Sequence, residues 1–257
     1  MGFYDLDKPD RDALVSKINA ELAGDLGLSQ YKHLIRYFSD GDTYIRKTAY
    51  LAIGKLYAGR SLRQPILAAL EKLMFEADPK IRQTVVNAAG EIGKTDFDSV
   101  RHFFDNGLFD DHHSVRNAVI GSMKKMGEKN PAPVLEWSHK YLLHDDKEIR
   151  REICHGLELR GRTHPEEILP MLKDLQHDKT KRVRWTLVHV IGQVAYKKGC
   201  LEKVMADIIT WDNKALVKDA IAEIIDVHHR YRNFSFYTQQ EAIAYIEPFL
   251  RQLKYQD

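Results

Sequence analysis

The stretch YIRKTAYLAIGKL (residues 44–56) recurs in altered form as KIRQTVVNAAGEIG (80–93) and RVRWTLVHVIGQVA (182–195). In each copy, apolar residues follow the first arginine after Ile or Val by three, four and seven positions. This spacing places the apolar residues in one stripe along an α-helix. The sequence therefore predicts an amphipathic helix that is repeated along the chain.

The basic residue of this stretch returns at intervals of 36 and then 34 residues, each time after Ile or Val. Its positions are Arg46, Arg82, Arg116, Arg150, Arg184 and Lys218. A fixed period of this length is typical of stacked helical hairpins. We expect a single domain over 1–257, with repeats at roughly 29–61, 62–95, 96–130, 131–163, 164–199 and 200–232 and a C-terminal cap at 233–257.

Each expected repeat also contains a first helix ahead of the recurring stretch. Capping-box patterns, a hydroxyl residue followed three positions later by Gln or Glu, occur at Ser61, Thr163 and Thr238. No segment alternates between apolar and polar residues as a strand does. The fold class expected is all-α.

The pattern resembles HEAT repeats of the shorter kind over nearly the whole chain. It has an Asp shortly before Ile/Val-Arg, and a glycine eight residues after the arginine at Gly54, Gly90 and Gly192. Tetratricopeptide repeats share the period, but their Trp, Leu-Gly and Tyr pattern is not present. The resemblance implies a right-handed α-solenoid whose second helices line the concave side.

Composition narrows the class of protein. The chain is 44% hydrophobic and 30% charged, and no apolar run approaches the ~18 residues that span a bilayer. The first residues have neither the basic nor the apolar region of a secretory signal, so we expect a cytoplasmic protein. The two cysteines lack metal-binding spacing and are expected to be reduced, structural thiols.

The column of basic residues is interpreted as structural. On a helical wheel the arginine falls inside the apolar stripe, so its stem must lie along the core and its head must reach an acceptor. The acidic residue upstream, in the same or a neighbouring repeat, is the expected partner. This predicted ladder comprises Arg46, Arg82, Arg116, Arg150, Arg184, Asp42, Asp78 and Asp146.

The side of the second helices that faces away from the apolar stripe is the expected binding face. Trp185 is its most unusual member, because an exposed indole can anchor an interface; packing against the neighbouring repeat is the alternative. The other candidates on this face are His189, His155, Arg151, Lys125 and Gln193.

No metal or cofactor is expected. His155, His189 and Glu223 occupy equivalent positions in successive repeats, but adjacent helices lie about 8–10 Å apart, too far for easy shared ligation. A HEAT-repeat oxygenase family uses His-Glu dipeptides at a di-iron centre, and this sequence contains none.

Basic residues also gather where the second helices end. Helix dipoles explain this arrangement, and an edge that binds an acidic protein or a phosphate backbone is the alternative. The candidates for such a basic edge are Arg160, Arg162, Lys129, Lys197 and Lys198.

Residues 115–142 also resemble the HEAT-like alkylpurine DNA glycosylases, which implies damaged DNA held on the concave face. The aromatic residue of that family is replaced by Ser122, and its Trp-x3-Asp arrangement is missing. The chain is therefore expected to be a non-catalytic scaffold, whose partner is most simply another protein. DNA binding or glycosylase activity is the alternative.

Overall fold

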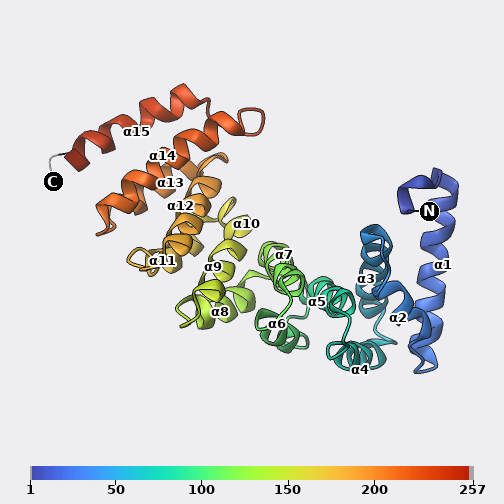
Figure 1. The fold of residues 1–257 in the computed structure, drawn as a ribbon. Coiled ribbons are helices and arrows are strands. Elements are labelled where there is room, and N and C mark those ends of the chain that lie inside the picture. The colour runs from blue at the N-terminus through green and yellow to red at the C-terminus, as the bar shows by residue number, and fades with distance from the viewer. Residues whose placement is uncertain (1, 255–257) are drawn as a thin grey trace. The chain divides into compact units, whose positions relative to one another are not determined.

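The structure, a computed structural model, describes residues 2–254, which form helices and no strand (Figure 1). The chain is an all-α solenoid of consecutive helix pairs. Its contacts divide it into two compact units, the first ending at Pro133 and the second beginning at Val134. This junction lies near the expected boundary between the third and fourth repeats. The single domain over 1–257 stays a prediction, and each unit is described by itself.

The first unit begins with a short 3-10 helix at Phe3–Asp5 and a long helix, α1 (Lys8–Gly27), that packs on the first helix pair. Three pairs follow: α2 (Lys32–Phe38) with α3 (Thr43–Ala58), α4 (Arg63–Leu73) with α5 (Pro79–Gly93), and α6 (Arg101–Leu108) with α7 (His113–Lys129).

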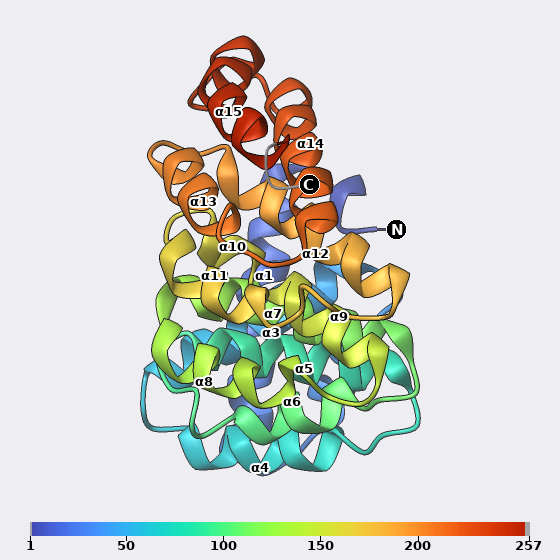
Figure 2. The same ribbon diagram turned by 90° about the vertical axis from the view of Figure 1, so that its left-hand side faces the viewer.

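The second unit contains three further pairs and a closing helix, and its first helix starts three residues before the unit boundary. They are α8 (Pro131–Leu142) with α9 (Lys147–Gly156) and the short α10 (Glu158–Gly161), α11 (Pro165–Lys173) with α12 (Lys181–Ala195), α13 (Cys200–Ile208) with α14 (Lys214–Arg230), and α15 (Gln239–Lys254). The closing helix packs on α13 and α14 (Figure 2).

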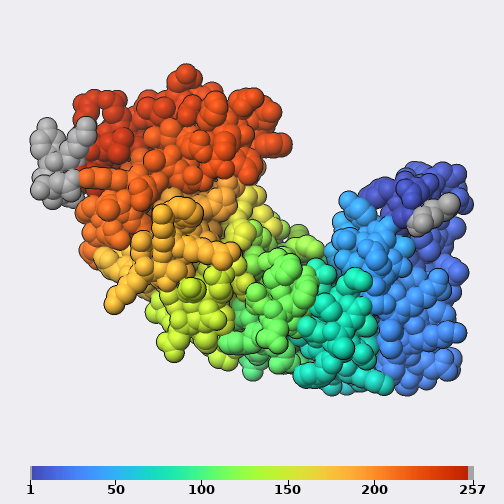
Figure 3. All heavy atoms as spheres, viewed as in Figure 1, coloured from blue at the N-terminus to red at the C-terminus, as the bar shows by residue number. Residues whose placement is uncertain are grey.

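Second helices pack on one another inside each unit. In the first unit α5 lies between α3 and α7, and in the second α12 lies between α9 and α14. The apolar stripes read from the sequence are buried: Val85 and Val86 of α5 and Leu187 of α12 are 0% exposed. Burial of such a side chain contributes about 1.5–3 kcal/mol. Figure 3 shows the packed heavy atoms of each unit.

Aspartates begin three of the second helices. Asp42, Asp78 and Asp146 are the N-cap residues of α3, α5 and α9, and each side chain accepts a hydrogen bond from the backbone two residues further on. Such a cap is worth about 1 kcal/mol. These three predicted ladder residues therefore hold the start of their own helix.

The predicted capping boxes form at one of the three positions. Thr238 and Glu241 bond to each other's backbone N–H at 3.2 and 2.8 Å, as expected ahead of α15. The predictions for Ser61 and Thr163 were wrong. Helices α4 and α11 begin later, after Leu62 and His164, and neither residue's side chain caps the helix.

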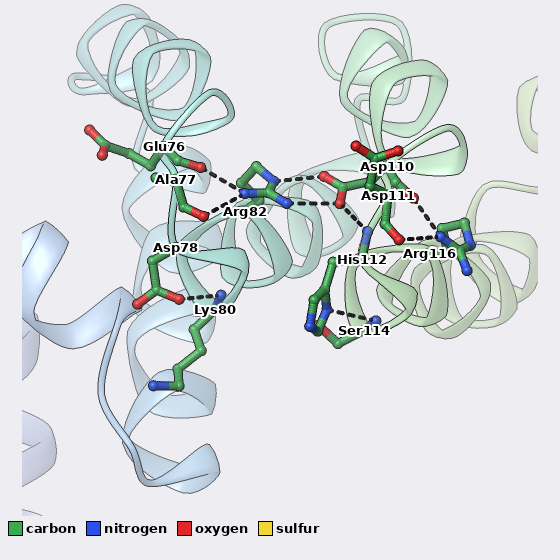
Figure 4. A network of polar contacts seen from close by, with 10 residues as sticks. All are labelled: Glu76, Ala77, Asp78, Lys80, Arg82, Asp110, Asp111, His112, Ser114 and Arg116. Atoms are coloured by element: carbon green, nitrogen blue, oxygen red, sulfur yellow. Dashed lines mark hydrogen bonds and ion pairs between the residues drawn. The ribbon is translucent and has the colours of Figure 1, made fainter.

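The ladder arginines bind the turn that precedes their own helix. The guanidinium of Arg82 donates to the carbonyls of Glu76 and Ala77 at 2.8 and 3.0 Å, and Arg116 donates likewise to Asp110 and Asp111 at 2.6 and 2.9 Å (Figure 4).

The same contact recurs at the other three arginines. The carbonyl acceptors are those of Asp40 and Gly41 for Arg46, of His144 and Asp145 for Arg150, and of Asp178 for Arg184. No helical N–H reaches these carbonyls, so the guanidinium supplies them with a hydrogen-bond donor from the protein itself.

Two of these arginines also bond to the carboxylate of the next repeat. Arg82 reaches Asp110 at 2.7 and 2.9 Å, and Arg150 reaches Asp178 at 2.6 and 3.3 Å. The five arginines of the column therefore each make hydrogen bonds inside their own unit.

Gly90, one of the glycines eight residues after the recurring arginine, shows why a side chain is excluded at that position. A Cβ on Gly90 of α5 would lie 2.4 Å from the Oγ atom and 2.7 Å from the Cβ atom of Ser122 on α7. The two helices can approach this closely only without that side chain.

Two further expectations concern membranes and thiols. Among residues 2–254, no helix is long and apolar enough to cross a membrane. Cys154 and Cys200 are both unpaired and buried, and burial raises the pKa of each thiol.

Candidate functional site

Trp185 lies on the open side of α12 and is 65% exposed, whereas Trp137 and Trp211 are 6% and 0% exposed. The indole N–H of Trp211 donates to Asp207 at 2.7 Å inside the second unit. Lys181, one turn before Trp185, places its ammonium 4.8 Å from the centre of the indole ring. Trp185 is therefore the one indole of the three that a partner can reach.

Trp185 lines three hollows, and the smallest, about 280 Å³ in volume, lies between α12 and the start of α14. The two larger hollows flank its ring. The first, between α12 and α14, has a volume of about 690 Å³ and is lined by Trp185, Val188, His189, Asp219, Glu223, Asp226 and Arg230. The second, between α9 and α12, has a volume of about 340 Å³ and is lined by Arg151, His155, Arg182, Trp185, Thr186 and His189. We call these the α14 hollow and the α9 hollow.

The α14 hollow is acidic. It holds three carboxylates and one arginine, and Arg230 donates to Glu223 at 2.6 Å and to Asp226 at 2.5 Å. Asp219, which is exposed, adds a further negative charge next to Trp185. A cationic group of a partner is therefore favoured on this side of the ring.

The α9 hollow has arginines and histidines in place of carboxylates. Its arginines are paired with glutamates. Arg151 donates to Glu148 and Glu152 at 2.9 and 3.3 Å, and Arg182 donates to Glu148 at 3.2 Å. Arg151 is only 17% exposed, so it contributes less surface to the face than the sequence suggested.

The two histidines of the α9 hollow lie together over Glu158. The Nε2 atom of His155 lies 3.2 Å from the carboxylate of Glu158, and that of His189 lies 4.0 Å from it. The Nδ1 atom of His189 lies 3.5 Å from Glu223. His155, Glu158 and His189 each offer one donor atom, and the three atoms lie within 4.8 Å of one another.

Glu158 is the member of this cluster that the sequence analysis missed. The second helix breaks at Leu157, so that α9 ends at Gly156 and α10 begins at Glu158. The signal was present as His155-x-x-Glu158, since residues three apart share one side of a helical turn.

Gln193 was wrongly predicted to belong to the binding face. It is 1% exposed and accepts a hydrogen bond from Arg162 at 2.7 Å. The helical wheel places its position toward solvent, but α10 packs against α12 and covers the end of that helix.

Lys125 belongs to the first unit, on α7. Its ammonium lies 3.6 Å from Glu91 of α5 and 5.5 Å from the centre of the Tyr50 ring of α3. It therefore joins three second helices of that unit, and its side chain is still 44% exposed.

The predicted basic edge carries less free positive charge in the second unit than its arginines suggest, because those arginines are paired with glutamates. Arg160 bonds to Glu167 at 2.8 and 2.5 Å and is 12% exposed, and Arg162 bonds to Glu158. Lys197 and Lys198 lie over the rings of Tyr196 and Phe236, at 4.7 and 5.6 Å. Lys129, in the first unit, is exposed.

The residue that replaces the glycosylase aromatic lies in a packing contact. Ser122 is 2% exposed and its hydroxyl bonds to the carbonyl of Val86 at 3.4 Å. Ser122 therefore offers no aromatic ring with which a damaged DNA base could be contacted.

Comparison with solved structures shows the same kind of fold. A chain from a structure of Kap95p binding to RanGDP has a TM-score of 0.52 and 15% identity, covering 92% of this chain and 34% of its own. A chain from the crystal structure of a Kap121p mutant has a TM-score of 0.53 and 13% identity, covering 98% and 29%.

These likenesses show an all-α solenoid fold of repeated helix pairs. The chain spans only about a third of the length of these two karyopherins. No family model and no curated protein matches the sequence.

Proposed function

We propose that the chain is a non-catalytic scaffold that binds another protein through the second-helix face around Trp185. The observation that carries the proposal is the exposed indole between two hollows, since the ring of a tryptophan held at the surface offers a large contact area at little cost in entropy. The karyopherin-like repeat fold is consistent with a protein partner.

The charges around Trp185 indicate the chemistry of the partner segment. An apolar or aromatic side chain would stack on the indole, and a lysine or arginine beside it would enter the α14 hollow toward Asp219. A hollow of about 690 Å³ is large enough for such a side chain.

A peptide-display selection tests this proposal. Peptides are selected on the full chain, and their affinities for the unchanged chain and for Trp185→Ala are then measured by fluorescence anisotropy. Loss of a central aromatic anchor costs about 2 kcal/mol or more, so Trp185→Ala should bind roughly 30-fold more weakly.

The matched control is Phe234→Ala, which removes another aromatic ring of the second unit that is 67% exposed. This variant should bind the selected peptides as the unchanged chain does. Selected peptides that bind Trp185→Ala equally well would refute the proposal.

The alternative, a DNA-binding protein or alkylpurine glycosylase, makes different predictions. It requires salt-dependent affinity for duplex DNA, and a glycosylase would also release free base from alkylated duplex. Saturable base release would reverse the ranking of the two functions.

A further inference from the structure

His155, Glu158 and His189 form a compact donor set beside the α9 hollow. They come from α9, α10 and α12, which pack together within the second unit. From this geometry we propose that the three side chains bind a Zn²⁺ ion, with the fourth coordination position open toward the hollow.

The distances are close to those of a tetrahedral site. Zinc binds imidazole nitrogen and carboxylate oxygen at about 2.0–2.2 Å, which puts neighbouring donor atoms roughly 3.4 Å apart. The two histidines lie 3.2 and 4.0 Å from the Glu158 carboxylate, and no pair of donor atoms exceeds 4.8 Å. The imidazoles are 33% and 41% exposed, so rotation of these rings can close the remaining gap.

The carboxylate is held in place by the fold. Glu158 is 4% exposed, and Arg162 binds one of its oxygens while the other oxygen faces both histidines. A carboxylate fixed in this way loses little freedom when it ligates an ion.

A carboxylate lies near the far nitrogen of His189, where zinc-binding histidines typically have an outer partner. Its Nε2 atom faces Glu158, and its Nδ1 atom lies 3.5 Å from the carboxylate of Glu223 on α14. A carboxylate on the far nitrogen sets the tautomer that leaves Nε2 free to ligate, and it strengthens the imidazole as a ligand.

Two nitrogens and one oxygen select the class of metal. Ca²⁺ and Mg²⁺ prefer sets of oxygen donors, whereas two histidines with one carboxylate suit Zn²⁺ and leave one position for water or a substrate. The α9 hollow, about 340 Å³ in volume and lined by both histidines, provides room for that fourth ligand.

The test is calorimetric titration of the full chain with zinc chloride alone. We expect one ion per chain, and at least about tenfold weaker binding in His155→Ala and in His189→Ala, because two donors cannot hold the ion as three do. His139→Ala is the matched control, since it removes an exposed histidine of the same unit outside the cluster. It should bind zinc as the unchanged chain does.

Two further measurements keep the proposal open to refutation. Co²⁺ in place of Zn²⁺ should give the intense visible absorption of four-coordinate cobalt, and Glu158→Gln should lose it while circular dichroism shows the helices intact. If Glu158→Gln unfolds, the two histidine variants decide alone. Absence of stoichiometric zinc binding, or equal zinc affinity in His155→Ala, His189→Ala and His139→Ala, would overturn the proposal.

Discussion

Arg82 contacts both oxygens of Asp110, with Nε at 2.7 Å and Nη2 at 2.9 Å. The two residues lie 28 positions apart, and Arg150 repeats the contact with Asp178 at the same separation. Each carboxylate also accepts the backbone N–H two residues further along the chain, at 2.8 and 2.7 Å. The pair therefore joins the second helix of one repeat to the turn that precedes the second helix of the next repeat.

Removal of this guanidinium should destabilise the first unit. Arg82→Ala leaves the Asp110 carboxylate, which is 8% exposed, without its charged donor, and we expect a loss of about 2 kcal/mol in the free energy of unfolding. Urea unfolding followed by circular dichroism measures it.

Arg46→Ala is the matched control. The hydrogen bonds of Arg46 go to carbonyls of its own turn and to Thr43, so this variant loses the local contacts and no carboxylate bond. Its cost should be smaller. Equal costs for Arg46→Ala and Arg82→Ala would show that the Asp110 contact adds nothing.

The same carboxylates should make stability depend on acid pH. Burial raises the pKa of Asp110 and of Asp178, but hydrogen bonds and the charge of the paired arginine lower each pKa by more, so both are net lowered. Their contribution to stability is complete above the unfolded value, near pH 3.9, and is lost as pH falls through the folded pKa.

The double variant Asp110→Asn, Asp178→Asn checks this dependence. Its midpoint of urea unfolding should fall less steeply than that of the unchanged chain as pH is lowered from about 5 toward 2. Parallel curves would mean that neither carboxylate changes its pKa on folding.

The second helices and their buried faces were predictable from the sequence, because the recurring arginine marks the start of each apolar stripe. The sequence predicted an acidic acceptor for Arg82 in the same or a neighbouring repeat, and it is Asp110 of the next repeat. The choice between the two repeats did not follow, since a partner 28 residues away is known only once the hairpin geometry is known. Gln193 failed for a related reason: a helical wheel describes one helix and not the α10 turn that covers it. Glu158 was not predicted as a site residue, because it lies just after the break between α9 and α10.

The close approach of α5 and α7 gives a further prediction. Gly90→Ala would place a Cβ 2.4 Å from the hydroxyl oxygen of Ser122, so the helices must separate at a cost of about 1–3 kcal/mol.

Gly121→Ala, on α7, is the control because nothing lies within 4 Å of the added Cβ. This change should stabilise the helix by up to about 1 kcal/mol. Thermal unfolding of both variants gives the comparison, and two shifts of the same sign would contradict the packing described for Gly90.

Arg160 gives a test of the DNA alternative. A residue that contacts a phosphate contributes about 0.9 to the slope of log affinity against log salt. Because Arg160 is already paired with Glu167, we expect Arg160→Gln to leave that slope unchanged for duplex DNA at low salt. A slope reduced by about one would instead place Arg160 on a phosphate.

The exposure of Trp185 can be measured directly. Trp185→Phe leaves only the buried indoles of Trp137 and Trp211, so tryptophan emission should shift to the blue and acrylamide quenching should fall sharply.

Trp185→Ala should change the free energy of unfolding by no more than about 0.5 kcal/mol, whereas Trp211→Ala should cost about 3–5 kcal/mol by leaving a cavity. A large loss of stability in Trp185→Ala would mean that the ring packs against the fold and is not available to a partner.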